Sequence, residues 1–326
     1  MILQRLSLFG ILLALFVVIL GAYVRLSDAG LGCPDWPGCY GSLIVDDSQQ
    51  GIHAAAESFP ERPLESSKAW KEMTHRYFAS ALGFVILLLT YFAWRQPQLG
   101  QRGLTLSLLI LVLFQGALGM WTVTLLVKPV IVMGHLLGGL SILSLLFLLL
   151  LRLANKRLPT IKNNPVLKVL APAALLVLVL QIALGGWTST NYAALACPEL
   201  PTCLDESWQP DVDYQEGFVL WRGLGVDYEY GVLTNQARAA IHWVHRIGAV
   251  VTTVLLTLLA FLLFRIGAKT EVKLLLGCLF SQLLLGVLNV VFSLPLPLAV
   301  AHNGVAALLL LSVVYLNFRL NSYKLS

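Results

Sequence analysis

Residues 274–318 read LLLGCLFSQLLLGVLNVVFSLPLPLAVAHNGVAALLLLSVVYLNF and contain no Asp, Glu, Lys or Arg. A helix needs about 20 mostly apolar residues to cross the hydrocarbon core of a bilayer, so this run is long enough for two. Pro295 and Pro297 divide it, because proline removes a backbone donor and clashes with the preceding helical turn. The run therefore predicts two membrane-spanning helices joined by a short turn.

Six further runs lack charged residues, namely 6–24, 77–94, 103–127, 129–151, 169–198 and 247–264. Charged residues make up 12% of the chain, against roughly 25% in soluble domains. The first run follows Arg5 as in a secretory signal, but it is longer than the roughly 7–15 residues of a signal core and no small-x-small cleavage site follows it. We therefore expect an all-α polytopic membrane protein with eight transmembrane helices, the first of them retained.

Basic residues are concentrated on one side of these helices. That side carries 13 Lys and Arg residues against one acid, Glu271, whereas the other side carries 9 basic and 16 acidic residues. Cytoplasmic loops are enriched in Lys and Arg, so both termini are expected in the cytoplasm of a bacterium, with the chain in its inner membrane. The pI of 9.0 reflects this topology and not nucleic-acid binding. The 13 residues are Arg5, Arg95, Arg102, Arg152, Lys156, Arg157, Lys162, Lys168, Arg265, Lys269, Lys273, Arg319 and Lys324.

An internal repeat divides the chain. The segment GAYVRLSDAGLGCPDWPGC from Gly21 matches GGWTSTNYAALACPELPTC from Gly185 in its first glycine and both cysteines, at an offset of 164. QGALG at 115–119 matches QLLLG at 282–286 at an offset of 167, and THR at 74–76 matches VHR at 244–246 at an offset of 170. Such self-similarity predicts duplicated units, here two pseudo-symmetric four-helix bundles formed by residues 1–160 and 161–326. Two long polar segments, about 27–70 and 190–237, face outward.

Four histidines occupy equivalent positions in the two halves: His75, His135, His245 and His302. Each is expected within about the first two turns of an even-numbered helix, which enters the membrane from outside, so all four lie at similar depth. Two imidazoles on facing helices can hold a haem iron, and the repeat pairs His75 with His135 and His245 with His302. A single intramembrane histidine more often bonds to another helix, but four equivalent ones favour haem. Zinc is disfavoured because structural zinc sites cluster their ligands closely.

Residues near these histidines extend the haem hypothesis. Gly138, Gly248 and Gly304 can let a flat macrocycle approach the backbone, or they can serve helix packing. Arg76 and Arg246 directly follow two of the histidines and can pair with haem propionates, or they can anchor the helices at the interface.

The repeat aligns Glu72-Met-Thr-His75 with His242-Trp-Val-His245, so the first half has Glu72 where the second half has His242. Residues three apart share a helix face, so the Glu72 carboxylate is expected near the haem that His75 ligates. There it can act as a base or stabilise positive charge at the haem edge. The alternative is that Glu72 solvates the outer end of the helix beside Lys71.

Two cysteine pairs lie in the outer segments, Cys33 with Cys39 and Cys197 with Cys203, each enclosing five residues. Evenly spaced pairs in an oxidising compartment predict disulfides, and a redox role is the alternative. Cys278 has no partner in its helix and is expected to be a buried structural thiol.

These features together resemble the haem A synthase family. The resemblance rests on SDAGLGCPDWPGCYG from Ser27, the Glu72-Met-Thr-His75-Arg76 motif, the duplicated cysteine pairs, and the positions of His135, His245 and His302. It implies oxidation of the C8 methyl of haem O to a formyl group, giving haem A for cytochrome oxidase. It further implies that His75 and His135 hold the substrate haem, that Glu72 assists the reaction, and that His245 and His302 hold haem B. Candidate partners are a haem O synthase, oxidase assembly factors and further copies of the chain.

Two other classes of function remain open from the residues alone. A di-haem b-type membrane electron-transfer protein would use both halves as equivalent relays, and the difference between Glu72 and His242 argues against it. A thiol oxidoreductase usually carries a C-x-x-C motif, which neither cysteine pair provides.

Overall fold

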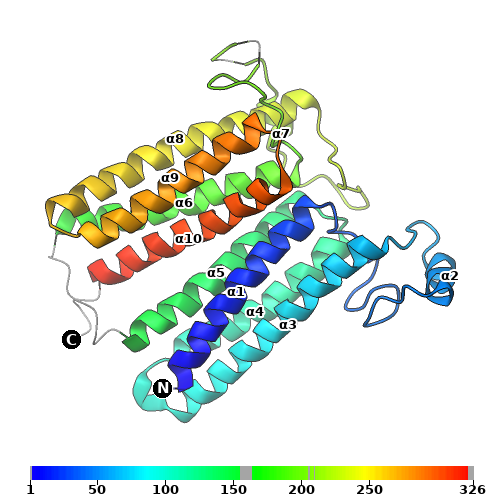
Figure 1. Cartoon of the computed structure of the whole chain (residues 1–326), viewed down its shortest axis with the longest axis horizontal. Helices are drawn as coiled ribbons and strands as arrows, with labels where there is room; N and C mark the ends of the chain where they lie inside the picture. The colour runs from blue at the N-terminus through cyan, green and yellow to red at the C-terminus, as the bar shows by residue number, and fades with distance from the viewer. Residues whose placement is uncertain (1, 155–163, 205, 209, 322–326) are drawn as a thin grey trace.

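The structure is a computed structural model that describes residues 2–154, 164–204, 206–208 and 210–321, and these form two groups of long helices (Figure 1). In the described part, eight helices are long and apolar enough to cross a membrane, and its only β-structure is two isolated bridges. The first four are α1 (Ile2–Leu26), α3 (Ser66–Arg95), α4 (Arg102–Thr124) and α5 (Pro129–Ala154). The second four are α6 (Pro165–Thr190), α8 (Asn235–Arg265), α9 (Lys269–Val291) and α10 (Leu296–Asn321). Shorter elements are α2 (Gln49–Ser58), the 3-10 helix η1 (Pro97–Leu99) and α7 (Tyr214–Gly217).

The turn between α9 and α10 confirms the division of the long apolar run. α9 ends at Val291 and α10 begins at Leu296, between the two prolines that mark the break. Ser293 and Leu294 adopt positive φ there, as Leu126 and Val127 do between α4 and α5 at an offset of 167. The same backbone path therefore joins the last two helices of each half.

The helix ends repeat at the offsets found in the sequence. Adding 167 to the first and last residues of α4 and α5 gives those of α9 and α10. Adding 164 to the last residue of α1 gives that of α6, and adding 170 to the last residue of α3 gives that of α8. Packing repeats as well: α1–α3, α3–α4, α4–α5 and α5–α1 contacts correspond to α6–α8, α8–α9, α9–α10 and α10–α6 contacts. This is the pattern that two related four-helix bundles require. The boundary expected between them, at residues 160 and 161, lies outside the described residues.

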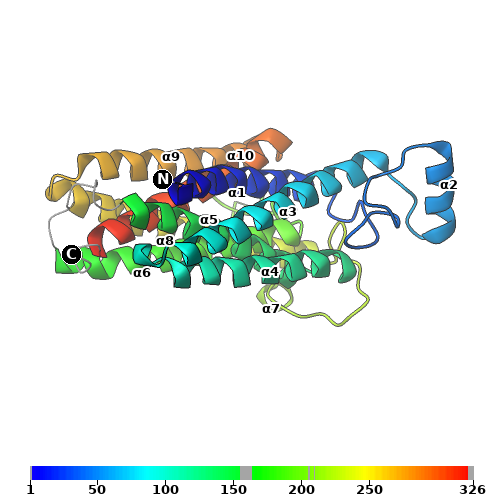
Figure 2. The same ribbon diagram turned by 90° about the horizontal axis from the view of Figure 1, so that it is seen from below.

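The two bundles lie side by side with their helices along one common direction (Figures 1 and 2). They meet where α5 packs against α10, with α1 against α10 on one side and α5 against α6 on the other. Between 17% and 39% of the residues in the most apolar stretch of each spanning helix are buried inside the protein. Most of the apolar side chains therefore face outward, as a lipid environment requires.

α1 begins and α10 ends at the same end of the molecule, while α2 and α7 lie at the other end (Figure 1). At the α2 and α7 end, the segment before α8 crosses to the first bundle: Tyr228 N donates to Leu126 O at 3.2 Å, and Arg62 pairs with Asp227 at 2.7 Å. At the opposite end, the single acid Glu271 is neutralised by Arg319 at 3.1 Å. The basic residues Lys156, Arg157, Lys162 and Lys324 lie outside the described residues.

Candidate functional site

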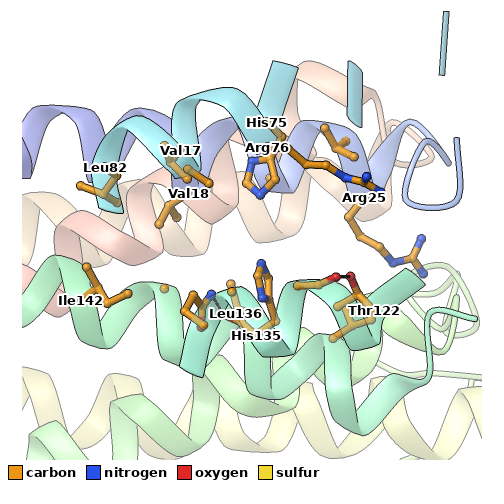
Figure 3. A pocket seen from close by; sticks show the side chains of 18 of the residues that line it. Val17, Val18, Arg25, His75, Arg76, Leu82, Thr122, His135, Leu136 and Ile142 are labelled. Atoms are coloured by element: carbon orange, nitrogen blue, oxygen red, sulfur yellow. Dashed lines mark hydrogen bonds between the residues drawn. The ribbon is translucent and has the colours of Figure 1, made fainter. Parts of the chain in front are cut away.

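A cavity of about 530 Å³ lies inside the first bundle, between α1, α3, α4 and α5. Its walls are mainly apolar, and His75 on α3 and His135 on α5 point toward each other across it (Figure 3). The two ring centroids are 6.4 Å apart. A metal–nitrogen bond of about 2 Å on each side would place two imidazole centroids about 6 Å apart. The separation of the rings therefore fits a haem iron between them, and neither Nδ1 has a hydrogen-bond partner among the described residues.

The second bundle places His245 on α8 and His302 on α10 at the equivalent positions, and each of these rings contacts a glutamine. Gln181 Nε2 lies 3.1 Å from His245 Nδ1 and donates to His245 O at 3.0 Å. Gln282 Nε2 lies 3.1 Å from His302 Nε2. This pair therefore also has the composition of a bis-imidazole haem site.

Every one of the four imidazoles packs against a glycine of a neighbouring helix. A methyl group placed on each glycine would lie 2.9–3.3 Å from the Cε1 atom of the ring, closer than ordinary contact. Only glycine leaves room for the ring so close to a helix backbone. The four glycine–histidine pairs are Gly21 with His75, Gly119 with His135, Gly185 with His245, and Gly286 with His302. Sequence reasoning missed this role, although all four glycines lie in the repeated motifs.

Of the two roles left open for the glycines near the histidines, the structure gives contacts for helix packing. The position of a methyl group on Gly138 is filled by the amide of Gln115, and that on Gly248 by the amide of Gln181. Gly304 faces Ile19 of the first bundle at 3.4 Å. The glutamines need this space because their amides reach the histidine helices.

Glu72 and His242 occupy the same structural place. Glu72 Oε2 accepts a hydrogen bond from Cys33 N at 2.9 Å, and Glu72 Oε1 pairs with Arg76. His242 Nδ1 accepts from Cys197 N at 3.1 Å, and its Nε2 lies 3.3 Å from Arg246 Nε. Both side chains therefore hold a cysteine loop onto its helix, and Glu72 in addition lines the cavity beside His75.

The two arginines direct their donors into the cysteine loops. Arg76 Nη1 donates to the carbonyls of Asp35, Pro37 and Gly38 at 3.0, 3.2 and 2.5 Å. Arg246 donates to the carbonyls of Glu199 and Thr202, both at 2.6 Å, and of Cys197 at 2.5 Å. The contacts of Arg76 and Arg246 thus show that they hold the cysteine loops. Their pairing with haem propionates stays a prediction.

Arg25, which sequence reasoning missed, is a further cation at the cavity. It lies near the end of α1 with its side chain 16% exposed, and its Nε is buried without a hydrogen-bond partner among the described residues. Nη2 donates to Ser189 O at 2.8 Å, and the guanidinium lies 4.3 Å from the ring centroid of Tyr192. Figure 3 shows Arg25 at one end of the cavity, beyond the histidine pair. Ser189 is the residue that the repeat places opposite Arg25, at the offset of 164.

Tyr192 and Asp28 complete this contact between the bundles. Tyr192 OH donates to Asp28 Oδ1 at 3.0 Å, and Arg25 Nη1 lies 3.7 Å from the same oxygen. Burial raises the pKa of the Tyr192 hydroxyl, so it stays protonated and remains a donor. The end of the cavity beyond the histidine pair is therefore bordered by a charged cluster shared between the halves.

A model of the COX15-CtaA family, described as a cytochrome oxidase assembly protein, matches residues 4–314. The chain belongs to the COX15-CtaA family. It is 48% identical to the heme A synthase of Shewanella oneidensis over 93% of the chain and 92% of that protein. It is 26% identical to the heme A synthase of Rhizorhabdus wittichii over 95% of the chain and 91% of that protein. It is also 27% identical to heme A synthase COX15 of Mus musculus, over 92% of the chain and 77% of that protein.

In this COX15-CtaA chain the histidines lie deeper along their helices than expected. His135 and His302 are the seventh residues of α5 and α10, but His75 and His245 are the tenth and eleventh of α3 and α8. The expectation of two turns was wrong for the latter pair, because α3 and α8 begin with polar turns that precede the apolar stretch. Four histidines at comparable depth still result.

The cysteine pairs form the disulfides Cys33–Cys39 and Cys197–Cys203, as predicted. All four residues are at most 1% exposed, which argues against thiol exchange with an outside partner because attack on a disulfide needs access to sulfur. Cys278 is the free cysteine of the described part and is partly buried in the core. In the same part no group of three His, Cys, Asp or Glu residues could hold a metal ion, which also disfavours zinc.

Proposed function

We propose that this COX15-CtaA chain oxidises the C8 methyl group of haem O to a formyl group, giving haem A, in its N-terminal bundle. The observation that carries the proposal is the apolar cavity with His75 and His135 facing each other across it. Its volume of about 530 Å³ lies within the range of ligand sites, roughly 300–1,000 Å³. The relatives named heme A synthase match nearly the whole chain.

His75 and His135 would hold the iron of the substrate, and the apolar walls would keep water from the reacting edge. Glu72 lines the cavity three residues before His75, and its carboxylate is fixed by Cys33 N and Arg76. A carboxylate held in a dry site stabilises positive charge that develops on a substrate, and we assign this role to Glu72. With water as the source of the oxygen atom, conversion of the methyl group to a formyl group releases electrons and protons, so it requires an electron acceptor outside the chain.

Arg25 would recognise the carboxylates of the substrate. Its buried Nε has no partner among the described residues, whereas the Nη1 of Arg76 is shared among three loop carbonyls. Guanidinium groups bind carboxylates through several directed hydrogen bonds. The propionates would thus lie at the outer end of the cavity, with the iron between the histidines.

The C-terminal bundle would hold haem B between His245 and His302. When bound, this haem would supply an iron that can carry electrons, and the protein would supply the two imidazoles. We propose residues 1–160 as the substrate half and residues 161–326 as the haem B half. Both termini would lie in the cytoplasm, in a bacterial inner membrane, with a haem O synthase, oxidase assembly factors or further copies of the chain as partners.

Purified protein supplied with haem O and an electron acceptor tests the proposal. We expect haem A, identified by chromatography and mass spectrometry, from the wild type and none from His135→Ala. A di-haem electron carrier would return haem O unchanged and would leave the haem types of cells unchanged when it is deleted. Either result would reject the proposed function.

A further inference from the structure

The two halves differ at the residue that faces the first histidine of each pair. His245 Nδ1 lies 3.1 Å from the amide of Gln181 on α6, and that amide also bonds to His245 O. The repeat places Val17 of α1 opposite Gln181, at the offset of 164. Val17 lines the cavity and has no polar group, and His75 Nδ1 has no hydrogen-bond partner among the described residues. His245 is thus held by a glutamine where His75 is not.

Several other features of the two sites are matched. Both rings pack against a glycine, Gly21 for His75 and Gly185 for His245. Glu72 and His242 each accept a hydrogen bond from a cysteine N–H of their loop, so these two residues do not make His75 and His245 differ in how their rings are held. Gln115 and Gln282 stand at equivalent positions, but Gln115 Nε2 donates to the backbone oxygen of His135, whereas Gln282 Nε2 contacts the ring of His302, so the second histidines also differ in the same direction.

The contact to Gln181 has a direct effect on a metal ligand. A hydrogen bond to the second nitrogen of an imidazole fixes the orientation of the ring and raises its basicity, and losing such a partner typically costs 10–100-fold in metal affinity. When Nε2 binds iron, Nδ1 carries the proton and needs an acceptor. Gln181 Oε1 has no hydrogen-bond partner among the described residues, and it becomes that acceptor when the amide turns over. Gly248 leaves the space that the Gln181 amide occupies.

We propose that Gln181 and Val17 set different haem lifetimes in the two halves. Gln181 fixes His245, so the C-terminal half retains its haem, whereas Val17 leaves His75 unsupported, so the N-terminal half releases haem readily. This inference rests on the proposed function, in which one haem must leave as product and the other stays. It identifies Gln181 as a positioning residue and assigns the substrate half without relying on Glu72.

Two single-site proteins separate the halves. His135→Ala removes the N-terminal pair, and His302→Ala removes the C-terminal pair. Each protein is loaded with haem B, and the loss of haem to an excess of apo-globin is followed by absorbance. We expect Gln181→Val to speed haem loss from the His135→Ala protein at least tenfold. We expect Val17→Gln to slow haem loss from the His302→Ala protein by a similar factor.

Gln4→Val is the matched control, because Gln4 lies at the other end of α1 and bonds to Leu153 O at 2.9 Å. It should change neither rate, and helicity by circular dichroism verifies that each variant is folded. Unchanged rates in folded Gln181→Val and Val17→Gln proteins would overturn the inference. If the His302→Ala protein binds no haem at all, the proposed function fails, and the Gln181→Val measurement still decides the role of Gln181.

Discussion

Glu72 has two tasks at one position, since its oxygens hold the Cys33 loop and Arg76 while its side chain lines the cavity. Glu72→Gln separates these tasks, because the amide oxygen can still accept from Cys33 N but the negative charge is lost. We expect the variant to bind haem as the wild type does and to form haem A at least tenfold more slowly. Haem content by absorbance and product by chromatography measure the two effects.

Glu65→Gln provides the control for this substitution. Glu65 directly precedes α3 and pairs with Lys68 at 2.9 Å on the exposed surface. Its loss should leave product formation unchanged, since exposed ion pairs contribute little. If Glu72→Gln loses its haem, the role of Glu72 is to hold the loop and not to assist the reaction.

If Arg25 binds the haem propionates, removing their negative charge should weaken haem binding. A haem whose propionates are methyl esters should bind the His302→Ala protein about tenfold more weakly than haem B, since a hydrogen bond to a charged group contributes roughly 1.5–3 kcal/mol. In the same protein carrying Arg25→Gln, the two ligands should bind equally. Arg95→Gln, at the far end of α3, should preserve the difference. A tenfold difference that persists in Arg25→Gln would exclude Arg25 as the carboxylate partner.

The histidines and Glu72 could be found from sequence because intramembrane ionisable residues are rare and the repeat aligned them. The partners of Arg76 and Arg25 could not, because they depend on how a loop folds and how two helices meet. Arg76 follows a histidine in sequence, yet its guanidinium lies against the carbonyls of residues 35–38. Sequence adjacency thus pointed to Arg76, and the fold brings Arg25 to the same cavity with an Nε that has no hydrogen-bond partner among the described residues.

The helices carry the next level of information, and the glycine contacts allow a prediction there. A methyl group on Gly21 would lie 2.9 Å from His75 Cε1, whereas one on Gly10 of the same helix would make ordinary contacts at 3.5 Å. Overpacking typically costs about 1–3 kcal/mol, so Gly21→Ala should displace the ring and weaken haem binding about tenfold in the His302→Ala protein. Gly10→Ala is the matched control and should bind haem normally. Equal affinity of the two variants would show that the ring does not need this space.

Helix positions were predicted well because hydropathy and charge are local signals. The apolar runs and the prolines at 295 and 297 locate the spans, and the repeat offsets reproduce the helix ends. The rotation of one helix against another is not a local signal. For this reason the sequence left open whether Gly138 and Gly248 serve a macrocycle or helix packing, and the glutamine amides that fill the space beside them are seen only in the structure.

At the scale of the whole molecule, the charge asymmetry predicts which end faces the cytoplasm. In a Cys278→Ser background, Ser58→Cys in α2 and Gln98→Cys in η1 introduce single exposed thiols at opposite ends. A membrane-impermeant maleimide added to intact spheroplasts should label Ser58→Cys and not Gln98→Cys, because the basic end stays inside. Lysed membranes should label both. Labelling of Gln98→Cys alone in intact spheroplasts would invert the topology.

The contact between Arg25 and Ser189, together with that between Asp28 and Tyr192, joins residues that are each other's counterparts in the repeat. Two residues related by the repeat can contact each other only near the pseudo-two-fold axis that relates the halves. In a complex of identical subunits, a contact between equivalent residues marks a two-fold interface. A four-helix precursor could therefore have formed a homodimer with each residue 25 beside its own copy. Fusion of two gene copies would free the two members of each pair to diverge, and a glutamine retained or lost in one copy would suffice to turn two equal haem sites into a substrate site and a cofactor site.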